Sequence, residues 1–179
     1  MKTPGIGSKK KKFQSFIGRG LKKIKSPVQK MEEQKLNKKL KNIKNYLGSF
    51  AVDELHLVKF FTYPSFAVIN FDRRREGGSH WLAIAIYPND IYVCDSLGGI
   101  LPIKNMSQSL INFLNIISVR RHIHVTKRLQ PIDSSLCGSY CVFFIREMSK
   151  SNSFFEFLSY FSTNLCKNDK IIKILNKQK

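Results

Sequence analysis

Two short apolar runs in the middle of the chain are joined by a Pro-Asn-Asp turn at residues 88–90, and this pattern constrains the fold more than any other. Residues 81–87 and 91–95 are rich in β-branched and aromatic side chains, as strands are. So short a connection allows only antiparallel pairing of the two runs. In such a hairpin the start of the first strand lies beside the end of the second. His80 and Asp95 are therefore predicted to be neighbours.

The rest of the chain predicts helices around a small sheet. Further strands are expected at residues 66–70 and 122–127, and helices at 107–118, 137–148, 153–165 and 168–177. An earlier helix is expected to start at Ser26-Pro27, carry an apolar stripe and end at Gly48. The stripe of that helix comprises Leu36, Leu40, Ile43 and Leu47, and the inward side of helix 107–118 comprises Leu110, Ile111, Leu114 and Ile117. The predicted fold class is α+β, with a small mainly antiparallel sheet flanked by helices.

The chain divides into a basic tail at residues 1–30 and one folded domain at residues 31–179. Its 179 residues and 42% hydrophobic content suffice for one core. The tail holds ten Lys or Arg side chains and no acid, and is rich in Gly and Ser. A segment of this composition is expected to be flexible.

The formal net charge of +19 indicates a polyanionic partner, and DNA is the expected one. The candidate DNA contacts in the tail are Lys9, Lys10, Lys11, Lys12, Lys22 and Lys23. A tail that only aids solubility is one alternative. Binding to a membrane surface is another, because Phe13, Ile17, Leu21 and Ile24 recur at near-helical spacing. A membrane partner is not expected, because no apolar run approaches the ~20 residues of a membrane span.

The four cysteines, Cys94, Cys137, Cys141 and Cys166, form neither a CxxC pair nor a dense disulfide framework. Together with the lack of a secretory signal, this predicts a reducing, intracellular setting. Packing roles are expected for all of them except Cys137.

Cys137 is followed by Gly138 and a strongly apolar segment, which predicts that the thiol lies at the N-terminus of a helix. The positive end of the helix dipole favours thiolate there. A thiol nucleophile also needs a base, a group that orients the base, and a donor to the oxyanion. His80, Asp95 and Gln130 are the candidates for these three roles.

Several residues compete for these roles. Asp72, Asp90 and Asp133 are alternatives to Asp95, and Gln130 could be an ordinary loop residue. His122 and His124 share a strand face, but no third ligand accompanies them, so no metal site is expected.

Four segments resemble the adenovirus-type cysteine proteases (the adenain family), relatives of the Ulp1-like SUMO proteases. The segments are Tyr-Leu-Gly-Ser-Phe at 46–50, Gly-Gly-Ser-His-Trp at 77–81, Tyr-Val-Cys-Asp-Ser-Leu-Gly at 92–98, and Gln130 with Cys137-Gly138. The resemblance implies His80 as base, Asp95 as orienting acid, Cys137 as nucleophile and Gln130 as oxyanion donor. Asp95 stands where adenain has Glu, and the basic tail has no clear counterpart there.

The resemblance further implies a viral thiol endopeptidase that cleaves capsid or virion precursors at Gly-rich sites during virion maturation. The alternative is a Ulp1-like deSUMOylase or deubiquitinase acting after Gly-Gly. No cofactor is expected for the chemistry, although DNA or a basic peptide is expected to stimulate it. The enzyme is expected to act as a monomer on precursor proteins inside the virion and the infected cell.

Overall fold

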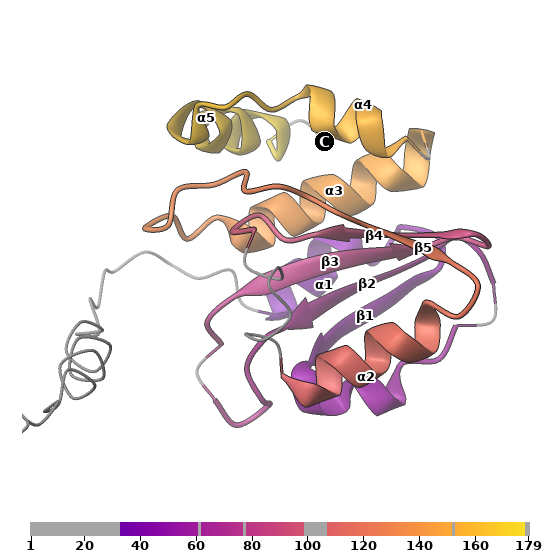
Figure 1. Cartoon of the computed structure of the whole chain (residues 1–179). Coiled ribbons are helices and arrows are strands. Elements are labelled where there is room, and N and C mark those ends of the chain that lie inside the picture. Colours follow the sequence, from indigo (N-terminus) through magenta and orange to yellow (C-terminus); the bar gives the residue numbers. More distant parts are fainter. Residues whose placement is uncertain (1–32, 61, 77, 99–106, 152, 178–179) are drawn as a thin grey trace, which may run out of the picture.

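The computed structural model describes residues 33–60, 62–76, 78–98, 107–151 and 153–177, which form one five-stranded sheet with helices on both faces (Figure 1). The strands are β1 (Tyr46–Ala51), β2 (Ser65–Asn70), β3 (Trp81–Ile86), β4 (Asp90–Cys94) and β5 (His122–Val125). The helices are α1 (Glu33–Leu40), the 3-10 helix η1 (Val52–Leu57), α2 (Gln108–Ile117), α3 (Cys137–Ser151), α4 (Phe154–Ser159) and α5 (Leu165–Leu175). The predicted α+β class is confirmed.

The five strands lie in the order β1-β2-β3-β4-β5. The three central strands pair antiparallel, and the register of β3 with β4 runs from Ala83 opposite Cys94 to Ile86 opposite Ile91. The predicted hairpin is therefore present. The two outer strands add parallel pairings, β1 with β2 and β4 with β5, which local sequence patterns did not reveal. The described sheet is therefore mixed, with two antiparallel and two parallel pairings, where a mainly antiparallel sheet was predicted.

Strand β3 is buried on both faces, because side chains alternate across the sheet and helices cover each side. Trp81, Ala83 and Ala85 belong to the core under α1 and α3. Leu82, Ile84 and Ile86 belong to the core under η1 and α2. This double burial explains why the strand is continuously apolar rather than alternating.

The two helical layers differ in size. Helix α3 packs across β3 and contacts α1, α4 and α5, which all lie on its side of the sheet (Figure 1). Helix α2 contacts η1 and covers the opposite face together with it. The layer that contains α3 is the one that carries Cys137.

The prediction that the first helix extends to Gly48 is wrong. Helix α1 ends at Leu40, and the Tyr-Leu-Gly-Ser-Phe segment lies in strand β1. Leu36 and Leu40 are buried as predicted, but Asn45 adopts a positive φ of 61° and turns the chain. The segment then pairs in parallel with β2. This contact between distant residues overrides the helical spacing that Leu47 shares with the residues before it. Ser26 and Pro27 lie outside the described residues.

Smaller differences affect two other helical regions. In α2, Phe113 is buried whereas Ile111 is only partly buried, so the inward side is rotated from the prediction. The predicted helix at 153–165 ends as α4 at Ser159, and α5 begins earlier than expected because Asn164 caps it by accepting from the Lys167 N–H. Among the described residues, none of the helices has the length and apolar content needed to cross a membrane.

Candidate active site

Three elements bring His80, Asp95 and Cys137 together. His80 directly precedes β3, Asp95 directly follows β4, and Cys137 is the first residue of α3. The antiparallel register of β3 and β4 places the first two at the same end of the sheet, as predicted from the hairpin. Helix α3 packs on β3 and brings its N-terminus to that end. All three side chains are buried, with exposed fractions of 7% or less.

The His80 ring is held by Asp95 on one side. His80 Nε2 lies 2.7 Å from Asp95 Oδ1, and the Leu97 N–H also donates to that oxygen at 3.1 Å. Asp95 is in turn fixed through its backbone, because Thr126 Oγ1 accepts from its N–H and donates to its carbonyl. A buried carboxylate held in this way sets the tautomer and orientation of the ring and stabilises imidazolium.

The other ring nitrogen of His80, Nδ1, is not the one that binds Asp95. Nδ1 is buried and has no partner in full hydrogen-bond geometry among the described residues. His80 and Cys137 are nevertheless close enough for each to shift the pKa of the other. Phe71 covers the ring, with ring centroids 5.3 Å apart.

The pKa values of the two groups shift in opposite directions. Burial opposes charge on His80, but its contacts with Asp95 and Cys137 outweigh burial and raise the pKa of His80 to about 9. Burial likewise opposes the Cys137 thiolate, yet His80 and the backbone N–H groups of Trp81 and Gly138 lower the pKa of Cys137. Both shifts favour a thiolate beside an imidazolium over a neutral thiol and imidazole.

Helix α3 starts at Cys137 for local reasons. The Leu136 carbonyl accepts from the N–H groups of Ser139 and Tyr140, and Ser134 Oγ accepts from the Leu136 N–H. These bonds form the first turn, and the apolar residues that follow are buried against β3. The first N–H groups of a helix lack intrahelical partners, so those near Cys137 remain available to an anion.

Gln130 is fully buried on the loop that leads into α3. Its Oε1 accepts from Ser96 Oγ at 2.8 Å, and its Nε2 donates to the Ser134 carbonyl at 3.3 Å. The adjacent Leu129 carbonyl accepts from Tyr140 in the first turns of α3, which ties the loop to the helix that carries Cys137. The structure therefore contradicts the alternative of a solvated loop glutamine.

The competing acids and histidines lie in other contacts. Asp72 accepts from Ser79 Oγ, and Asp90 lies 2.8 Å from His124 at the surface. Asp133 is exposed. His124 stacks on Tyr92, with centroids 4.8 Å apart. Within the part of the chain that the structure describes, no three His, Cys, Asp or Glu side chains cluster as metal ligands.

The four cysteines are free thiols in different surroundings. Cys94 and Cys141 are buried, and burial raises the pKa of both thiols well above the ordinary value. Cys166 is exposed. The candidate DNA contacts Lys9, Lys10, Lys11, Lys12, Lys22 and Lys23 lie outside the described residues.

Three supporting residues were missed by sequence reasoning, namely Phe71, Ser96 and Thr126. Phe71 directly follows β2 and Thr126 directly follows β5. No local pattern in the sequence marks either residue as part of a site. Ser96 had a usable signal, because it directly follows the candidate acid.

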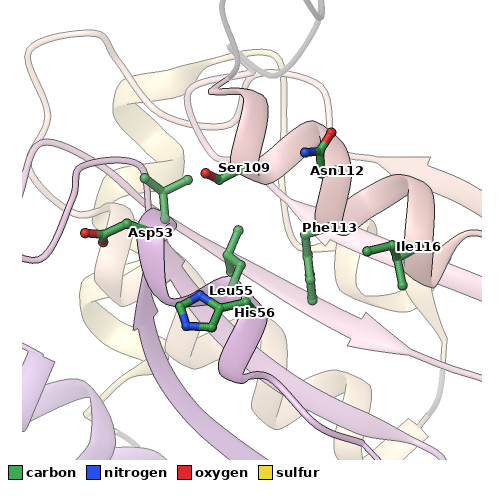
Figure 2. A pocket seen from close by; sticks show the side chains of 8 residues that line it. Asp53, Leu55, His56, Ser109, Asn112, Phe113 and Ile116 are labelled. Carbon is green, nitrogen blue, oxygen red and sulfur yellow. The ribbon is translucent and has the colours of Figure 1, made fainter.

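A separate pocket of about 210 Å³ lies between η1 and α2, as Figure 2 shows. Leu55 and Phe113 form its apolar floor, and Asp53, His56 and Asn112 contribute polar groups. It is on the sheet face opposite α3, so it is distinct from the Cys137 site.

A thiol close to an imidazole that is bonded to a carboxylate is the arrangement of a catalytic centre with a cysteine nucleophile. The adenovirus endoprotease family matches residues 46–176 of the chain, which include all four candidate residues. The chain therefore belongs to the adenovirus endoprotease family.

One similar protein is the protease of bovine adenovirus 4, which is 31% identical over 119 residues. The match covers 58% of this chain and 59% of that protein, so the chain spans about six tenths of its relative's length.

The solved structures that resemble the chain are distant. ChlaDub1 from Chlamydia trachomatis matches with a TM-score of 0.43 and 15% identity over 64% of this chain and 59% of that one. The ASFV protease matches with a TM-score of 0.47 and 18% identity over 80% of this chain and 64% of that one.

Proposed function

We propose that this chain is a viral cysteine endopeptidase in which Cys137 is the nucleophile, His80 the base and Asp95 the residue that orients His80. The observation that carries the proposal is the buried His80 ring, bonded to Asp95 at 2.7 Å, at the end of the sheet where α3 begins with Cys137. The opposite pKa shifts of His80 and Cys137 support the same pairing. Membership of the adenovirus endoprotease family supports the same activity.

The proposed roles account for each step of peptide hydrolysis. The Cys137 thiolate attacks the scissile carbonyl carbon, and the oxyanion that forms accepts from Gln130 Nε2 and the Cys137 backbone N–H. The His80 imidazolium then gives its proton to the leaving amine, which leaves a thioester on Cys137. Water attacks the thioester while neutral His80 takes its proton, and the acid product and the thiolate are released.

Substitution of the three residues tests the proposed roles. Cys137→Ala is expected to abolish cleavage of internally quenched peptides, and His80→Ala to come close to doing so. Asp95→Asn is expected to reduce cleavage less, because the ring is still partly held by packing against Phe71. Cys166→Ala is the matched control, because Cys166 is exposed and outside the site. Substantial cleavage by Cys137→Ala would refute the assignment.

The proposed substrates are capsid or virion precursors, cut during maturation in the virion or infected cell. The proposed cleavage sites have one of two Gly-rich forms, aliphatic-x-Gly-x before Gly or aliphatic-x-Gly-Gly. Membership of the family supports this choice over the alternative, a deSUMOylase or deubiquitinase that acts after Gly-Gly. The spacing of Gln130 and Cys137 supports it too, because the two are seven positions apart, as in adenain, rather than six, as in typical Ulp1-like enzymes. Fluorogenic SUMO and ubiquitin, compared with quenched peptides of the two Gly-rich forms, distinguish the alternatives. Efficient turnover of either modifier with no peptide cleavage would favour the second function.

We further propose that the chemistry needs no cofactor, whereas DNA or a basic peptide stimulates it. The net charge of +19 supports a DNA partner, and the chain is proposed to act as a monomer. Incubation of the purified protein with capsid proteins encoded near it, with and without DNA, tests substrate and stimulation together. Equal cleavage rates in both conditions would remove DNA from the proposal.

A further inference from the structure

We propose that Ser96 is a positioning residue that holds the Gln130 carboxamide with its NH₂ group toward the oxyanion. This inference rests on the proposed role of Gln130 as oxyanion donor. It assigns to Ser96 a part in the reaction although Ser96 touches neither Cys137 nor His80 in any hydrogen bond of the described residues.

Ser96 binds the Gln130 loop at three points. Its hydroxyl donates to Gln130 Oε1 at 2.8 Å. Its carbonyl accepts from the N–H groups of Leu129 at 2.8 Å and of Gln130 at 3.0 Å. Ser96 is 1% exposed and Gln130 0%, so water does not compete for these bonds.

The partners of Gln130 determine which way its amide faces. The Ser134 carbonyl can only accept, so the amide nitrogen must lie on the Ser134 side. Oε1 then faces Ser96, whose hydroxyl is able to donate to it. A flipped amide would set Oε1 against the Ser134 carbonyl, and it would present an acceptor where an oxyanion needs a donor. The Ser134 carbonyl therefore selects the productive orientation, and the Ser96 hydroxyl holds the amide in it by donating to Oε1.

The same turn also carries Asp95. The Gly98 N–H donates to the Asp95 carbonyl at 2.9 Å, which closes a turn over residues 95–98. Asp95 orients His80, and Ser96, the next residue, orients Gln130. One short turn thus sets the positions of both the base and the oxyanion donor relative to Cys137.

A double-mutant cycle tests the inference. Ser96→Ala is expected to lower kcat about threefold to tenfold with little change in KM. The variant loses one neutral hydrogen bond that orients Gln130, and Gln130 is proposed to bind the oxyanion only in the transition state. Gln130→Ala is expected to lower kcat roughly a hundredfold to a thousandfold. In the Gln130→Ala background, Ser96→Ala is expected to have no further effect on kcat, because it has no amide left to orient. Alkylation of Cys137 by iodoacetamide is expected to keep its rate in all three variants.

Two further variants separate positioning from folding. Ser49→Ala is the matched control, because Ser49 is another buried serine whose hydroxyl is bonded, to Tyr46 and Asn37, outside the site. It is expected to lower Tm without lowering kcat. If Ser96→Ala does not fold, Ser96→Cys replaces it, because a thiol of similar shape is only a weak donor. Ser96→Cys is expected to lower kcat when Gln130 is present and to have no further effect on kcat in the Gln130→Ala background.

The outcomes are distinct. Wild-type kcat in a folded Ser96 variant, or an equal loss of kcat with and without Gln130, would overturn the role of Ser96 alone. Wild-type kcat in Gln130→Ala would overturn the proposed role of Gln130, and the role of Ser96 with it. Loss of kcat confined to the background that retains Gln130 supports the inference.

Discussion

At the residue scale, the thiols differ because their surroundings differ. Cys137 is next to His80 and the first N–H groups of α3, whereas Cys94 and Cys141 are buried where thiolate is unfavourable. Iodoacetamide at neutral pH is therefore expected to label Cys137 before Cys94, Cys141 and Cys166, as followed by peptide mass spectrometry. His80→Ala is expected to slow this labelling. Uniform labelling of the four cysteines would contradict an activated thiol.

The pH dependence of kcat/KM follows from the same pair. Activity is expected to rise as Cys137 loses its proton and to fall near pH 9, where His80 loses the proton that the leaving amine needs. Protonated His80 also contributes to folding stability. Because its pKa is raised above the ordinary value of about 6.5, this contribution is complete below about pH 6.5 and is lost as the pH rises through about 9.

Asp95→Asn tests whether His80 causes the fall of kcat/KM at alkaline pH, which is the alkaline limb of the pH profile. The substitution removes a contact that raises the pKa of His80, so the limb is expected to move to lower pH. Asp90→Asn is the control, because Asp90 makes a similar contact with His124, 2.8 Å long, at the surface. An unmoved limb in Asp95→Asn would show that another group controls it.

At the element scale, the turn at residues 95–98 depends on Gly98. Gly98 has a φ of 65°, and a Cβ there would lie 2.8 Å from the Arg128 backbone nitrogen. Gly98→Ala is therefore expected to cost about 1–2 kcal/mol from the positive φ alone, and to push the loop that carries Gln130 away from the turn. Both Tm and kcat are expected to fall, as measured by thermal melting and peptide cleavage.

Gly48→Ala is the control that separates the effect of Gly98→Ala on Tm from its effect on kcat. Gly48 also has a positive φ, of 122°, but a Cβ there would meet only the Phe50 ring at 3.7 Å, which is an ordinary contact. It is expected to lower Tm and to leave kcat unchanged. Equal kcat in the two variants would show that the turn does not position the site.

At the scale of the whole molecule, the charge is concentrated in residues 1–30, which hold ten basic side chains and no acid. Binding to DNA is expected to be independent of sequence and to weaken steeply with salt, because basic groups release condensed counterions. Deletion of residues 1–30 is expected to lower the affinity and flatten the dependence of log K on log salt, as measured by fluorescence anisotropy. Unchanged affinity and slope would place the contact in the folded domain.

Membrane-surface binding by the same tail predicts a different result. Co-sedimentation with anionic vesicles that persists at high salt would favour this alternative, because burial of Phe13, Ile17, Leu21 and Ile24 does not depend on screened charges.

The amino-acid sequence by itself determined the central hairpin, the helix that begins at Cys137, and the identity of the candidate site residues. These features depend on interactions over a few residues, which turn chemistry and hydrophobic periodicity report directly. The Pro-Asn-Asp turn made it predictable that His80 and Asp95 are neighbours, because a short connection places the start of the first strand beside the end of the second. Cys137 was predictable for a similar reason, since the apolar helix behind it is a local pattern.

The tertiary structure alone decided which elements and contacts complete the site. Tyr46–Ala51 forms a strand that pairs with β2, although Leu47 continues the apolar spacing predicted for the first helix. Phe113 rather than Ile111 faces inward because of how α2 packs on η1. The bond between Ser96 and Gln130 joins residues 34 positions apart. Such contacts take their free energy from burial and bonding between distant segments, and no local pattern in the sequence encodes which segments will meet.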